Sequence, residues 1–330
     1  MRKLILSFAI LSLFVIQSCK DSLEPFGETN EKYVLNCIIR SDTSYQTLTL
    51  TRSYTTGNFD PYSNTTDPSI KGAIIRLWEG NDKVTFFTDT TIARDPASQY
   101  KTPYTIYQAR GIQPDQNEKL EIEAILPNGK KLTATGTTPI KPVFTKLGQS
   151  GGVGDTLVPM PGKDFIRAQW GTVIAPKGTV YLPRVYIVYK VPENGVEVRK
   201  IKMIPKDYFM YKGVEYPEYF GMSYYPWVNV ENTVIDRCMR EIAAGDDNKS
   251  KYKIYALIVD VLSLDDNLSA YYNATNKNKD PYSVKLYETD YTNIQGGFGV
   301  FGIRYLSSTS IDISAPYVRS FGYEHAYALD

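Results

Sequence analysis

Short segments of alternating apolar and polar residues dominate the first half of the chain. They are residues 32–40, 45–54, 73–90 and 118–139. The last two contain the central turn sequences Gly80-Asn81-Asp82 and Pro127-Asn128-Gly129, so each predicts a β-hairpin. About six short strands at a spacing of roughly 8–12 residues are typical of a β-sandwich.

The second half continues this pattern with longer strands. They are expected at residues 164–173, 180–191, 195–204, 251–263 and 282–306. The segment 251–263 is apolar on both faces around Leu257-Ile258-Val259, which predicts a central strand. One helix is predicted over residues 263–277, where Leu264, Leu268, Tyr271 and Tyr272 recur at helical spacing and Ser263 forms a loose capping pair with Asp266.

These patterns predict an all-β protein of two consecutive β-sandwich domains, immunoglobulin- or fibronectin-like, with one short helix in the second. The segment 137–144 has two prolines and no periodicity, and it indicates the domain boundary. We therefore expect an N-terminal sandwich over residues 31–140 and a C-terminal sandwich with insertions over residues 141–330. An apolar content of 42% in a chain of this length is enough for two cores.

The N-terminus has the layout of an export signal. Arg2 and Lys3 precede an apolar run at residues 4–16, and Ser18 stands directly before Cys19. The run is too short for a membrane span, which needs about 20 apolar residues. Residues 16–19 resemble a bacterial lipobox, which implies that residues 1–18 are removed and that Cys19 is acylated. Several acyl chains anchor a protein stably to a membrane, and residues 19–30 would then form a tether. The alternative is a plain signal peptide with an incidental cysteine.

Charge and composition exclude several classes of function. Removal of residues 1–18 takes away two basic residues, which leaves 35 basic against 36 acidic side chains, so no strong field is available to bind nucleic acid. His325 is the only histidine, so a multi-histidine zinc site cannot be built and a catalytic triad would depend on a residue near the chain end. The acidic segment 245–251 lacks the spacing of a calcium loop. We expect no metal and no cofactor.

Cys37 and Cys238 remain after the lipidation site. An exported location permits a disulfide between them, but their spacing alone cannot pair them. Two buried free thiols are the other interpretation.

A second motif lies near the C-terminus, where Gly297, Gly299 and Gly302 have the G-x-G-x-x-G spacing of a dinucleotide-binding loop. Such a loop leads into a helix whose N-terminus binds the pyrophosphate. Residues 300–305 instead alternate with the period of a strand. We therefore expect Gly296 and Gly297 to allow special backbone angles and Gly299 and Gly302 to leave room for close packing, at a bend into the last strand.

The best candidates for contact with a ligand or partner are aromatic residues between Tyr211 and Trp227, a segment expected to be a loop. They are Tyr216, Tyr219, Phe220, Tyr224, Tyr225 and Trp227. Rigid amphipathic rings suit the binding of a glycan or a protein. The alternative is a loop that packs its own rings onto the sandwich.

Three carboxylates near the predicted helix raise the question of catalysis. Asp260, Asp265 and Asp266 could include a glycosidase pair, but such a pair needs a fixed separation across a cleft. Helix capping is the simpler role. No catalytic residue is assigned.

The lipobox cysteine, the two sandwich-like regions and the stretch from Asn293 to Gly302 are together similar to a family of Bacteroidota outer-membrane lipoproteins known only as a domain of unknown function. The similarity covers residues 19–305 and includes the segments 32–42, 46–53, 70–80 and 134–140. Family members are commonly encoded beside TonB-dependent receptors. The resemblance therefore implies a non-catalytic accessory protein that acts with such a receptor in nutrient uptake and binds a glycan or another nutrient.

The resemblance also implies a location. Lys20, Asp21 and Glu24 partially match the acidic export signals of surface lipoproteins in this phylum, so we expect the protein on the outer face of the outer membrane. A carboxylate-based glycoside hydrolase and a structural component of an envelope complex are the alternative functions.

Overall fold

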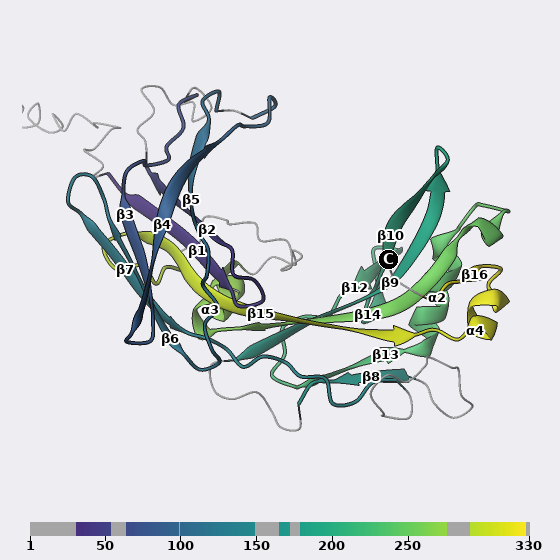
Figure 1. Ribbon diagram of the computed structural model, residues 1–330. Coiled ribbons are helices and arrows are strands. Elements are labelled where there is room, and N and C mark those ends of the chain that lie inside the picture. Colours follow the sequence, from purple (N-terminus) through teal and green to yellow (C-terminus); the bar gives the residue numbers. More distant parts are fainter. Residues whose placement is uncertain are drawn as a thin grey trace, which may run out of the picture.

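The computed structural model describes residues 31–53, 64–98, 100–148, 165–171, 179–275 and 291–327. The expected signal peptide (1–18), the lipidation site Cys19 and the tether (19–30) lie outside the described residues. The described chain is all-β, as its pattern predicted. Twelve strands form one continuous sheet, and two further pairs of strands form separate ribbons (Figure 1). None of the helices in these ranges is long and apolar enough to cross a membrane.

Seven strands of the first half form a β-sandwich. They are β1 (Tyr33–Arg40), β2 (Gln46–Arg52), β3 (Ile74–Glu79), β4 (Lys83–Ile92), β5 (Tyr104–Ala109), β6 (Lys119–Ile125) and β7 (Lys131–Thr137). Burial alternates with period two along β1, β3 and β5. β4 joins the two layers, because residues 83–87 pair with β3 and residues 88–92 pair with β5. β5 was not predicted.

The long strand β15 (Phe298–Asp312) belongs to both halves of the molecule. Its first part pairs in parallel with β1 as far as Arg304, and its second part pairs antiparallel with β14 (Lys253–Leu264) from Arg304 onward. Phe301 lies in the core of the first sandwich, and Ile311 lies in the second core. β15, drawn in yellow, therefore connects the two halves (Figure 1). The domain boundary expected at residue 141 stays a prediction. The core of the first sandwich also includes Ile294, Phe301 and Ile303, which lie far beyond that boundary in the sequence.

The second half packs part of the sheet against a ribbon and a helix. The strand order is β10–β9–β14–β15. The covering layer consists of two strands and a helix, β8 (Phe165–Gln169), β13 (Trp227–Glu231) and α2 (Asn232–Ile242). These elements share one hydrophobic core with the sheet. As predicted for the segment 251–263, β14 is a central strand, and it is buried along almost its whole length. The two strands that precede it in the order, β10 and β9, span Val196–Ile204 and Val180–Glu193.

One helix was predicted in the second half, and the described residues contain three α-helices. α3 (Asp266–Thr275) is the predicted one, but its N-cap is Asp265 rather than the pair of Ser263 and Asp266: the Leu268 N–H donates to Asp265 Oδ1 at 2.9 Å. α2 and α4 were not predicted, although the buried residues of α2 recur at helical spacing. The remaining short elements are η3 (Lys249–Lys251), α4 (Ala315–Ser320) and β16 (Glu324–His325).

Candidate functional site

The glycine motif lies where β15 comes closest to its neighbours. Gly299 has φ +109°, and a Cβ there would lie 2.1 Å from the carbonyl oxygen of Leu35 on β1. A Cβ at Gly297 would lie 2.7 Å from the carbonyl oxygen of Tyr33. Side chains cannot be accommodated at such distances, so these positions require glycine.

Gly296, directly before the motif, and Gly302, its last glycine, allow the same kind of contact. Gly296 has φ +81°, and its Cβ would lie 2.5 Å from the carbonyl oxygen of Lys131 on β7; the Cβ of Gly302 would lie 2.9 Å from the Cβ of Leu268 on α3. The motif leads into β15 and not into a helix. A pyrophosphate-binding helix N-terminus is therefore missing at this motif, and its glycines serve packing.

Both described cysteines are free and buried. Cys37 lies in the first core and Cys238 in the second. The disulfide that an exported location permits is therefore not formed, because the two thiols belong to separate cores. Burial raises the pKa of both thiols, which makes them poor nucleophiles.

The segment expected to be an aromatic loop begins as a β-hairpin. β11 (Asp207–Tyr211) pairs with β12 (Val214–Glu218) around the two-residue turn Lys212-Gly213. Both turn residues have positive φ, +51° and +77°, which is the geometry of a tight hairpin turn. The hairpin was not predicted, and the sequence feature that indicates it is the Lys-Gly pair between two apolar strands.

One face of this hairpin lies toward α2. The guanidinium carbon of Arg237 on α2 lies 3.5 Å from the ring centre of Tyr208. Arg237 also pairs with Glu215 on β12 at 2.8 Å and with Glu241 on α2 at 2.9 Å. These contacts attach the base of the hairpin to the body of the protein. Burial raises the pKa of the Tyr208 hydroxyl.

The opposite face of the hairpin is apolar and exposed, and we call it the aromatic face. It consists of Phe209, Tyr211, Val214 and Tyr216, whose exposed fractions lie between 42% and 57%. Phe209 is directly opposite Tyr216 and Tyr211 is directly opposite Val214, so the four side chains share one side. The rings of Phe209 and Tyr216 stack with centroids 6.0 Å apart. Exposed aromatic clusters of this kind mark interaction surfaces.

The six predicted contact residues divide into two groups. Tyr216 lies on the aromatic face, and Tyr219, Tyr224 and Tyr225 lie exposed in the segment 219–225, which we call the tyrosine loop. Phe220 packs against the second core. Trp227 is half-buried at the start of β13, where its ring contacts Tyr225. Phe220 therefore fits the second interpretation, in which the segment packs its own rings onto the sandwich. Phe209 was missed because the predicted segment began at Tyr211, and Tyr211 itself was not chosen among its contact residues.

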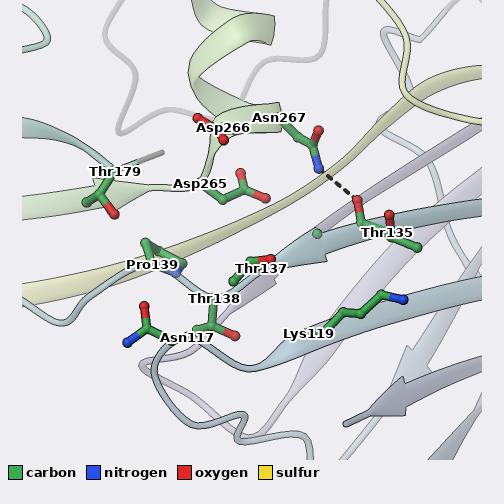
Figure 2. A pocket seen from close by; sticks show the side chains of 11 residues that line it. Asn117, Lys119, Thr135, Thr137, Thr138, Pro139, Thr179, Asp265, Asp266 and Asn267 are labelled. Carbon is green, nitrogen blue, oxygen red and sulfur yellow. Dashed lines mark hydrogen bonds between the residues drawn. The ribbon is translucent and has the colours of Figure 1, made fainter. Parts of the chain in front are cut away.

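A second candidate site is a polar cleft of about 410 Å³ between β7 and the start of α3. Thr135, Thr137 and Thr138 line one wall, and Asp265, Asp266 and Asn267 line the other (Figure 2). The lining is completed by Gly136, Pro139, Thr179, Asn117 and Lys119. The Asn267 side-chain amide donates to the Thr135 carbonyl at 2.9 Å and joins the two walls. We call this the threonine cleft.

Asp265 is one of the buried residues that line the threonine cleft. The residue is 2% exposed, and its carboxyl has the Leu268 N–H and the Asn267 side chain as hydrogen-bond partners. A Cβ on Gly136 would lie 3.1 Å from Asp265 Oδ2 and 2.9 Å from Ile303 Cδ1, so glycine allows β7 to approach the carboxyl closely. Burial raises the pKa of Asp265 from its ordinary 3.8 to about 7, against the opposing effect of the Leu268 N–H.

The three carboxylates considered for catalysis lie in different surroundings. Asp260 pairs with Arg184 at 2.9 Å. Asp265 and Asp266 are adjacent at the start of α3, and the described residues of the facing wall of the cleft include no carboxylate. Among the residues that the structure covers, no group of three or more His, Cys, Asp or Glu side chains could hold a metal ion.

A family model described as "Domain of unknown function (DUF4249)" matches residues 21–309, which is most of the chain. A comparison with curated proteins finds no match.

Proposed function

Because the chain belongs to the DUF4249 family of domains of unknown function, we propose a role that rests on its own residues. The protein is a non-catalytic binding protein, anchored by lipid to the outer membrane. It acts with a TonB-dependent receptor in nutrient uptake. The lipobox at residues 16–19 supports the anchor, and the export features of residues 20–24 support the outer face.

The observation that carries the proposal is the aromatic face of the β11–β12 hairpin. Four apolar side chains stand exposed on a two-stranded ribbon that the Arg237 contacts hold at its base. Aromatic residues on a preordered element provide contact area at low entropic cost, which is the property of an interface hot spot. The tyrosine loop follows directly in the chain and adds three exposed rings.

Co-purification from solubilised outer membranes tests this proposal. The variant Phe209→Ala/Tyr211→Ala/Tyr216→Ala removes the aromatic face, and we expect it to reduce capture of a TonB-dependent receptor by roughly tenfold or more. Tyr219→Ala/Tyr224→Ala/Tyr225→Ala tests the tyrosine loop separately. Phe220 is left unchanged because it packs against the second core, and Trp227 because it is half-buried on β13.

Phe86→Ala is the matched control, since Phe86 is an exposed aromatic residue on β4 of the first sandwich. It should leave capture unchanged. A thermal melt accompanies each variant, and the melting temperature should stay near that of the wild type because the replaced rings are exposed. Wild-type capture by the aromatic-face variant would exclude that face as the contact.

A further inference from the structure

The first sandwich has an apolar surface on the outer side of the layer formed by β4, β3, β6 and β7. Side chains that are paired in register across these strands share one side of the layer, and the inner side belongs to the first core. The outer side carries five apolar residues, which we call the apolar sheet face: Ile74, Trp78, Val84, Phe86 and Ile125. Ile74 and Phe86 are 56% and 58% exposed. None of the five belongs to a hydrophobic core of the described chain, and exposed patches of this kind mark contact with a protein or a membrane.

Long basic side chains lie among these apolar residues. The guanidinium carbon of Arg76 on β3 lies 4.6 Å from the ring centre of Trp78, and Arg76 also pairs with Glu123 on β6. Lys131 on β7 pairs with the same carboxylate. The apolar sheet face is therefore amphipathic. Aromatic rings beside basic side chains suit the boundary between lipid and water, where rings and alkyl stems contact lipid and the charges stay hydrated.

The chain enters the first sandwich at one end of this face. The Tyr33 hydroxyl, at the start of β1, donates to Glu31 and accepts a hydrogen bond from the Asn128 side-chain amide at 2.7 Å. Asn128 lies in the turn between β6 and β7, and Ile125 is the last residue of β6 before that turn. Ile125 pairs in register with Ile74 on β3. The described chain therefore begins beside the end of the apolar sheet face.

The distance to the lipid anchor is limited by the length of the chain that precedes this point. This inference rests on the anchor of the proposed function, at Cys19. Residues 19–30 can span at most about 40 Å. A tether of this length keeps the bilayer at a high effective concentration beside the apolar sheet face, so that contacts too weak to hold a free protein are sufficient.

We propose that the apolar sheet face lies on the surface of the bilayer to which the protein is anchored, with Trp78 and Phe86 at the level of the lipid head groups. A bilayer is favoured over a second copy of the chain because the tether ends beside this face. Figure 1 shows β3, β6 and β7 on the left of the molecule and β12 on the right. This orientation therefore leaves the aromatic face of the β11–β12 hairpin away from the lipid and accessible to a partner.

Fluorescence of a single tryptophan tests the orientation. The lipidated protein carries Trp170→Phe/Trp227→Phe, so that Trp78 alone emits. It is reconstituted into phosphatidylcholine vesicles that include phosphatidylcholine with a nitroxide spin label on its head group, which quenches tryptophans close to the bilayer surface. The control Trp78→Phe/Trp170→Phe leaves Trp227, which is half-buried like Trp78 but lies in the second half. We expect strong quenching of Trp78 and little quenching of Trp227.

A pair of serine substitutions shows whether the apolar sheet face makes this contact. Ile74→Ser/Phe86→Ser should reduce the quenching of Trp78, because it removes apolar area that the lipid would cover. Val143→Ser/Val196→Ser is the matched control, since both valines are exposed and lie outside the face. This control should leave the quenching unchanged. All four positions are exposed, so the fold should be retained, which a thermal melt checks.

Flotation of the vesicles in a density gradient separates a failure of the anchor from a failure of the orientation. Protein that does not float contradicts the lipid anchor of the proposed function, and this inference falls with it. Protein that floats overturns this inference alone if Trp78 is quenched no more than Trp227, or if Ile74→Ser/Phe86→Ser leaves the quenching undiminished. Analytical ultracentrifugation in detergent tests the other occupant: a dimer that Ile74→Ser/Phe86→Ser dissociates would assign the face to a second copy of the chain and overturn the inference.

Discussion

At the scale of single residues, the acidity of Asp265 depends strongly on its surroundings. Burial raises its pKa to about 7, so between about pH 4 and pH 7 the folded protein holds a proton that the unfolded chain releases. The free energy of unfolding that this group contributes therefore falls as pH rises through that window. In the variant Asp265→Asn, asparagine caps the helix as well as aspartate does, but its side chain does not titrate. We expect the variant to gain stability over the wild type as pH rises, on the order of 3 kcal/mol by pH 8.

Urea unfolding from pH 4 to pH 8, followed by tryptophan fluorescence, measures this difference. The comparison between variant and wild type cancels the contribution of the other carboxylates. Asp266→Asn is the matched control, because it removes a carboxylate from the same helix start at an exposed position. A difference between Asp265→Asn and the wild type that is constant with pH would show that the Asp265 carboxyl does not titrate in this window.

At the scale of elements, β15 depends on glycine to pack against β1. A Cβ at Gly299 would lie 2.1 Å from the Leu35 carbonyl oxygen, so Gly299→Ala has to displace β15 or β1 as well as adopt a strained φ. Gly72 also has positive φ, +71°, but has no atom within 4 Å of its Cβ position. We expect Gly72→Ala to cost about 1 kcal/mol in the free energy of unfolding, and Gly299→Ala to cost roughly 1–3 kcal/mol more.

Thermal or urea unfolding of the two variants side by side measures both costs. Backbone strain is common to the two positions, so the difference between them reports the close approach of β15 to β1. Equal losses of stability would contradict the packing role of the motif. Neither NAD nor ATP should raise the melting temperature of the wild type, because the motif does not lead into a helix.

At the scale of the whole molecule, the two cores share one strand. Phe301 of β15 is fully buried in the first core, whereas Ile311 of the same strand lies in the second. We therefore expect both halves to unfold in one cooperative transition. Phe301→Ala should lower the free energy of unfolding of both halves, by about 3–5 kcal/mol.

Tryptophan fluorescence distinguishes the halves, since Trp78 reports on the first and Trp170 on the second. Trp170→Phe/Trp227→Phe isolates the first probe, and Trp78→Phe/Trp227→Phe isolates the second. Their urea midpoints should coincide and should shift together when Phe301→Ala is added. Two separate transitions, with only the first shifted by Phe301→Ala, would mean that the halves unfold independently.

The sequence by itself determined the features that depend on local pattern. Period-two alternation is sufficient to identify most strands of both halves, because burial on one face of a strand requires apolar residues at every second position. The helix at Asp266–Thr275 and the central position of β14 followed from the same reasoning. The bend at the glycine motif could also be expected, since a strand pattern follows Gly299.

Only the tertiary structure decided the features that depend on contacts distant in the chain. The parallel pairing of β15 with β1 joins residues more than 260 positions apart, and no local pattern carries that information. The separation of Cys37 and Cys238 into different cores, the exposure of Phe209 but not of Phe220, and the burial of the Asp265 carboxyl beside Gly136 follow from the same kind of packing. Burial, and with it the pKa of Asp265, depends on which surfaces the whole fold brings together.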